Sequence, residues 1–139
     1  MLQNEFQEIE KSIHSIFTHY LTWFTFFSGV NLAGYGWFAQ LLAERKAVAK
    51  WLILIICIYF VFQQILALAA SQQLISYLKS SQKRMILLLT ELDQDSGYQI
   101  KAQIASPVEL YIRVTKLIMS TFPSMIFLWV AFTIFAFLK

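Results

Sequence analysis

The feature that most constrains this chain is a long uncharged run near its beginning. No side chain from residue 20 to residue 43 is charged. A helix needs roughly 20 residues to cross a hydrocarbon core, so this run is long enough to be a transmembrane helix. In residues 1–19, by contrast, apolar positions alternate with charged and polar ones, which predicts an amphipathic helix with one face in water. One long helix is therefore expected to begin in water and end in a bilayer.

Apolar residues recur at spacings of three and four along both parts of this segment. Such spacing is typical of a helix that packs against other helices along one seam. Three small residues, Gly29, Ala33 and Gly36, form a patch that would let another helix approach closely in lipid. The positions expected to face the packing partners are Leu2, Phe6, Ile9, Ile13, Ile16, Tyr20, Trp23, Phe27, Val30, Gly34, Trp37 and Leu41.

Two further uncharged stretches complete the membrane prediction. The first covers residues 51–70 and opens with Trp51, a residue type common at membrane interfaces. The second covers residues 117–138 and contains Pro123, which predicts a kink. Of the 139 residues 58% are hydrophobic, more than the about 45–50% typical of soluble domains. The sequence therefore predicts an all-α integral membrane protein, a single membrane domain with three transmembrane helices.

The second helix is expected to continue beyond the membrane. Residues 71–92 form its amphipathic extension, and residues 93–106 form a turn and a short segment, because the turn-forming sequence DQDSG begins there. Ser106 followed by Pro107 predicts the start of the third helix. Apolar positions continue along the extension at Leu74, Leu78, Met85, Leu88 and Leu92.

The distribution of basic residues predicts the orientation in the membrane. With three spans, the N-terminal helix and residues 79–116 share one side. The short basic connection after the first span and Lys139 lie on the other side. The first side carries seven Lys and Arg residues and the second carries four. The positive-inside rule then places the N-terminus in the cytoplasm, and we expect a bacterial inner (plasma) membrane location.

Polar residues inside the spans allow two interpretations. They can hydrogen-bond between helices, or they can line a hydrated path through an oligomer. No charged residue lies within a span, which argues against a proton relay or an ion-coupled transporter. The residues concerned are Asn31, Gln63, Gln64, Thr121 and Ser124.

Basic residues cluster at the ends of the second and third spans, where they would form a collar. Such side chains commonly extend to lipid phosphates, and they could also dock an acidic lipid or an acidic partner protein. The collar consists of Lys79, Lys83, Arg84, Arg113 and Lys116.

No pattern in the chain indicates an enzyme, a metal or a cofactor. His14 and His19 are the only histidines, and a separation of five places them about 140° apart on a helix, so they cannot share a metal. The single cysteine, Cys57, excludes an internal disulfide. The net charge of +3 is small and spread along the chain, so membrane lipids are expected as partners and nucleic acid is not.

Two functions fit these observations. Three spans make a thin core, so a cyclic homo-oligomer is expected. The first function is a self-assembling pore or channel, or a membrane-perturbing effector, whose cytoplasmic helices gate or sense. The alternative is a non-enzymatic anchor or adaptor whose cytoplasmic helices bind a partner protein.

Overall fold

The computed structural model is all-α, as the sequence predicts. Its helices are α1 (Leu2–Ala43), α2 (Lys50–Leu92) and α3 (Gly97–Leu138). The structure describes residues 2–43, 50–92 and 97–138. Both α1 and α2 are single helices over the lengths expected from their apolar spacing. The connection between α1 and α2 and the sequence DQDS lie outside the described residues.

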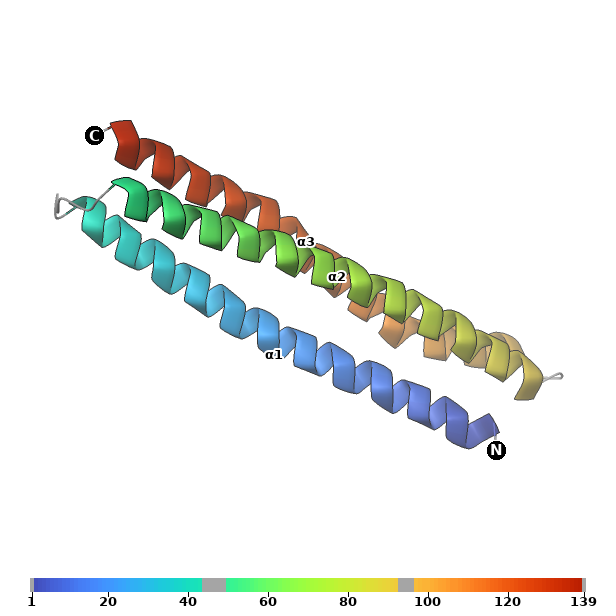
Figure 1. Ribbon diagram of the computed structural model, residues 1–139. Helices are drawn as coiled ribbons and strands as arrows, with labels where there is room; N and C mark the ends of the chain where they lie inside the picture. The colour runs from blue at the N-terminus through green and yellow to red at the C-terminus, as the bar shows by residue number, and fades with distance from the viewer. Residues whose placement is uncertain (1, 44–49, 93–96, 139) are drawn as a thin grey trace. The chain divides into compact units, whose positions relative to one another are not determined.

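The helices contribute to two compact units. Unit 1 contains Met1–Leu21 and Ala70–Ile118, and unit 2 contains Thr22–Ala69 and Met119–Lys139. Within each unit, a segment of α2 runs antiparallel to segments of α1 and α3 (Figure 1). Each helix has one position where the sequence is expected to change from water-facing to membrane-facing. In all three helices this position lies within two residues of the boundary between unit 1 and unit 2.

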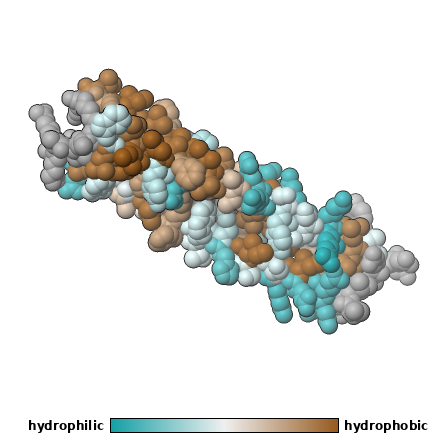
Figure 2. Space-filling view, viewed as in Figure 1, coloured by the Kyte–Doolittle hydropathy of each residue, from teal (hydrophilic) through white to brown (hydrophobic). Residues whose placement is uncertain are grey.

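Two of the helices are long and apolar enough to cross a membrane. The qualifying stretches are Trp51–Thr90 and Pro107–Leu138, and only 22% and 11% of their most apolar parts are buried. A core helix of a soluble protein is mostly buried, so this exposure is more typical of helices that face lipid. Figure 2 shows hydrophobic side chains predominating on the visible surface of unit 2 and hydrophilic ones on that of unit 1.

The expected first span, residues 20–43, is not one of these two helices. It carries no charge, but Asn31, Gln40 and three glycines make it less apolar than the other two stretches. Crossing by α1 therefore remains a prediction.

Along the central part of α1, every second residue expected on the buried face is exposed instead. Ile13, Tyr20 and Phe27 are buried as expected, but Ile16, Trp23, Val30 and Trp37 are exposed. The buried positions in their place are one residue further along the chain, as Phe17, Asn31 and Phe38 show. The expectation was wrong because spacings of three and four fit either phase equally well. The phase observed here buries Asn31, whose amide has partners inside unit 2.

The apolar stripe of α2 is confirmed at four of its five positions, and the side chain of the fifth, Leu92, lies outside the described residues. Leu74, Leu78, Met85 and Leu88 are all buried in unit 1. A seven-residue period is evident in α2 and in α3, as in helices that pack through a continuous seam. The buried positions at this period are Cys57, Gln64, Ser71, Leu78 and Met85 in α2, and Val108, Thr115, Phe122, Trp129 and Ala136 in α3.

The start of α3 differs from the prediction. The helix begins at Gly97, so residues 97–106 are helical and are not a separate short segment ending at Ser106. These residues include Gln, Ile, Lys and Ala, none of which opposes a helix strongly. The helix also continues through Pro107 and Pro123.

Aromatic side chains pack around Trp129 in the interior of unit 2. Its indole ring stacks on Phe60, with ring centroids 4.1 Å apart and an interplanar angle of 12°. Phe38 meets the same indole edge-on at 6.1 Å. A Cβ added to Gly34 would lie 3.0 Å from Cζ of Phe60 and 3.2 Å from Cζ2 of Trp129. Glycine at this position therefore lets α1 approach the stacked rings.

We expect Gly34→Val to destabilise unit 2 by about 1–3 kcal/mol, because the added methyl groups overlap rings that are held by their own stacking. Gly36→Val is the matched control, since a Cβ at Gly36 meets nothing within 4 Å. Both variants carry the same helix-propensity cost, so their difference isolates packing. Detergent titration followed by circular dichroism measures the two stabilities, and equal losses would contradict the packing assignment.

Candidate functional site

A buried polar cluster joins the three helices in unit 2. It consists of Asn31 on α1, Gln64 on α2 and Trp129 on α3, which are 1%, 0% and 1% exposed. Nε2 of Gln64 donates to Oδ1 of Asn31 at 2.7 Å, and Nε1 of Trp129 donates to the same oxygen at 3.3 Å. Nδ2 of Asn31 donates to the backbone oxygen of Phe27 at 2.9 Å. We call these three side chains the amide cluster.

The indole of Trp129 fixes how the amide of Asn31 is oriented. An indole N–H only donates, so the atom of Asn31 that faces it must be the oxygen. The amide nitrogen then faces the carbonyl of Phe27, which only accepts. Oε1 of Gln64 has no hydrogen-bond partner among the described residues. Asn31 therefore uses both its oxygen and its nitrogen, whereas Gln64 uses only its nitrogen.

The amide cluster bears directly on the two interpretations of the polar residues in the spans. Asn31 and Gln64 bond across helices of one chain, which is the interhelical arrangement. The aromatic side chains of Phe27 and Phe122 meet edge-on at 6.1 Å in the same unit, and both are buried. These two buried rings therefore pack against each other inside unit 2.

The other three polar residues of this group lie apart from the amide cluster. Gln63 is half-buried and donates to the hydroxyl of Tyr59 at 2.7 Å, one turn earlier on the same helix. Thr121 is half-buried and Ser124 is exposed. Tyr35, which sequence reasoning did not single out, donates its hydroxyl proton to the backbone oxygen of Met125 at 2.9 Å.

We expect Asn31→Leu to destabilise the protein by about 1–3 kcal/mol, because it leaves the donors of Gln64 and Trp129 buried without an acceptor. Gln64→Leu should cost less, since it also removes the unpaired Oε1. The double variant should lose less stability than the sum of the two single variants, by about 0.5–2 kcal/mol.

Detergent titration of the four proteins measures this coupling. Gln63→Leu is the control, because its hydrogen bond stays within α2, and it should change stability by less than about 0.5 kcal/mol. Strictly additive losses at Asn31 and Gln64 would contradict the amide cluster.

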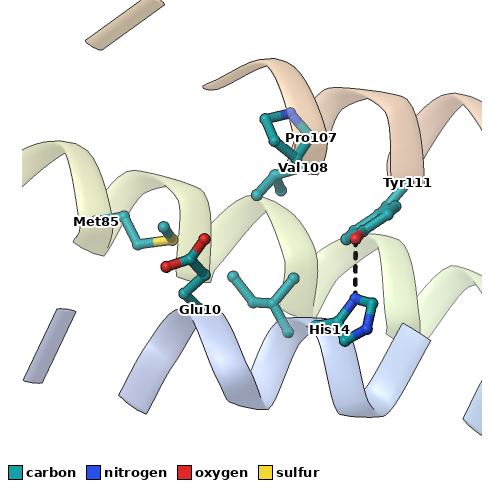
Figure 3. Close-up of a pocket in the computed structure, with 7 residues that line it drawn as sticks. Glu10, His14, Met85, Pro107, Val108 and Tyr111 are labelled. Atoms are coloured by element: carbon teal, nitrogen blue, oxygen red, sulfur yellow. Dashed lines mark hydrogen bonds between the residues drawn. The ribbon is translucent and has the colours of Figure 1, made fainter. Parts of the chain in front are cut away.

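A pocket of about 160 Å³ lies in unit 1. Glu10 and His14 line it from α1, Met85 lines it from α2, and α3 contributes Tyr111. Figure 3 shows Glu10 beside Met85, and His14 facing Tyr111. The remaining lining residues are Ile13, Pro107 and Val108. Glu10 and His14 are exposed, whereas Met85 and Val108 are buried, so the pocket combines a polar rim with an apolar interior.

Two contacts hold Tyr111 in place at this pocket. Its hydroxyl lies 3.1 Å from Nδ1 of His14, within hydrogen-bond distance. Its ring stacks on Phe17, with centroids 4.1 Å apart and an interplanar angle of 18°. Sequence reasoning missed this pocket because its lining comes from three distant segments. The only signal available was the spacing of Glu10 and His14, which places both on one face of α1.

The basic collar is partly neutralised within unit 1. Arg84 forms an ion pair with Glu5, and Nη2 of Arg113 lies 2.6 Å from the carboxylate of Glu109 one turn earlier. Lys79, Lys83 and Lys116 are exposed, and the described part of the chain offers them no ion pair. Three of the five collar residues therefore keep their charge available for lipid phosphates or an acidic partner.

The small-residue patch of α1 lies on the surface of unit 2. Gly29, Ala33 and Gly36 are all exposed, and a Cβ added to either glycine meets nothing within 4 Å. The patch is thus not used for packing among the described residues. Gly34, which lies between these residues, is the small residue that permits close packing.

Within residues 2–43, 50–92 and 97–138, no three His, Cys, Asp or Glu side chains converge on a point where a metal could bind. Cys57 is a free thiol, and its sulfur lies 3.6 Å from the backbone oxygen of Trp129. Comparison with known protein families, with curated proteins and with solved structures finds no match. The structure itself shows an all-α protein with two helices long and apolar enough to cross a membrane.

Proposed function

We propose that the protein is a non-enzymatic anchor of the bacterial inner membrane, whose unit 1 lies in the cytoplasm and binds a partner protein. The observation that carries this proposal is the amide cluster. Asn31 and Gln64 are almost fully buried polar side chains of unit 2, and they bond to each other and to Trp129. Polar groups used to hold helices together inside one chain are not available to line a path for water or ions.

The surface of unit 1 supports the partner-binding part of the proposal. Leu87 and Leu110 are both 57% exposed, in a unit that also displays Lys79, Lys83 and Lys116. Large apolar side chains within a charged surface are common in the centres of protein interfaces. Membrane lipids would contact unit 2, where Phe26 and Phe127 are exposed and the spans carry no charge.

A homo-oligomeric pore is the second candidate, and the exposed small-residue patch favours it. Gly29, Ala33 and Gly36 would let α1 of a second copy approach closely in lipid. A conducting path would then run between chains and would be lined by exposed polar residues such as Ser124.

Oligomeric state and vesicle leakage distinguish the two candidates. The anchor predicts a monomer or dimer in nanodiscs by native mass spectrometry, and no release of dye from liposomes that contain the purified protein. A closed ring of four or more subunits together with dye release would contradict the anchor and support the pore. The variant Gly29→Leu should leave the anchor unchanged but should disrupt such a ring.

Site-specific photocrosslinking in the native cells tests the partner. A photoreactive phenylalanine at Leu87 or Leu110 should give a protein adduct of one defined mass. The same residue at Phe127, which is 71% exposed in unit 2, should give no such adduct because lipid surrounds it. Charge reversal at Lys83 should weaken the adduct if the partner is acidic. Absence of a protein adduct at both leucines would contradict partner binding by this surface.

A further inference from the structure

The pocket of unit 1 has an uneven distribution of charge. Glu10 is the lining residue with a carboxylate, and no Lys or Arg is among the lining residues. Arg84 and Arg113, on neighbouring turns, are paired with Glu5 and Glu109. Lys11 and Lys83 are exposed on neighbouring turns, but they do not line the pocket. Among the residues that line the pocket, the carboxylate of Glu10 has no cation to offset it, so a cation would be attracted and an anion would be repelled.

The hydrogen-bonding groups of the pocket also suit a cation with N–H donors. A carboxylate accepts, and a phenol oxygen can accept while it keeps one other hydrogen bond. Tyr111 can thus retain its contact with His14 and still accept from an ammonium group. A metal ion is a poorer fit, because no third metal ligand joins Glu10 and His14 here among the described residues.

The size of the pocket limits the rest of the ligand. Its volume of about 160 Å³ is close to that of an engineered protein cavity of about 150 Å³ that takes up benzene. Its apolar interior is formed by Ile13, Met85 and Val108, all of them buried. An apolar group of about six carbon atoms fits this volume.

We infer that this pocket binds a small organic amine, with one ammonium group at Glu10 and an apolar body of about six carbon atoms against Met85 and Val108. This assignment is independent of the proposed anchor function, because it rests on the lining of the pocket alone. Binding would join residues of all three helices in unit 1.

Methyl signals of methionine provide a local test. The full-length protein is labelled with ¹³C in its methionine methyl groups, placed in nanodiscs and titrated with benzylamine. The Met85 signal, assigned by its loss in Met85→Leu, should shift and saturate in the millimolar range, as expected for a ligand of this size. Met119 and Met125 lie in unit 2 and should not shift. Benzyl alcohol, which has the same shape without the charge, should bind about tenfold more weakly.

Two matched variants test the role of the carboxylate. Glu10→Gln should weaken benzylamine binding about tenfold, to the level of benzyl alcohol. Glu8→Gln removes an exposed carboxylate from the same helix that does not line the pocket, and it should leave binding unchanged. A circular dichroism spectrum that matches that of the unaltered protein verifies that each variant is folded. The inference is overturned if Met85 does not respond, if Met119 and Met125 shift together with Met85, or if Glu10→Gln binds benzylamine as well as the unaltered protein.

Discussion

The hydrogen bonds of Asn31 determine how the helices of unit 2 face one another. An amide buried among apolar side chains costs free energy unless its donor and acceptor are both used. Asn31 meets this requirement through Phe27 on its own helix and through Gln64 and Trp129 on the other two. These bonds require α1 to present Asn31 to the interior, and Phe38, one heptad later, is turned inward with it. Trp129 stacks on Phe60 and excludes a larger side chain than glycine at position 34.

Buried residues recur at the same seven-residue spacing in both units, but the outer faces of the two units differ in polarity. In α2, the seven-residue series of buried positions includes Cys57 and Gln64 in unit 2 and Leu78 in unit 1. The opposite face of α2 is apolar in unit 2 and polar in unit 1, as expected when lipid covers one and water the other. The amide cluster belongs to unit 2. In unit 1 the buried polar contacts are smaller, such as the 2.8 Å hydrogen bond between Tyr20 and Ser71. The same seven-residue seam therefore lies beneath an apolar outer face in unit 2 and a polar outer face in unit 1.

Several features were predictable from the residues alone because they depend on local pattern. The long helices and the buried stripe at Leu74 and Leu78 follow from the spacing of the apolar residues. The buried face of α1 was not predictable, because its apolar residues are so abundant that two phases fit equally well. The helical start of α3 was missed because Ser106 and Pro107 form a strong N-terminal signal, yet the nine residues of α3 before them also accept a helix.

The sequence by itself determined that the chain is helical, that its helices change from amphipathic to apolar, and that polar side chains within the apolar parts need partners. These properties depend on residue type and spacing, which are local. Only the tertiary structure decided which partners they have. It directs Asn31 to Gln64 and Trp129, directs the patch of Gly29 and Gly36 outward, and assembles Glu10 and the phenol of Tyr111 around one pocket. Each of these contacts joins residues far apart in the chain, and their geometry is set by how three helices rotate against one another.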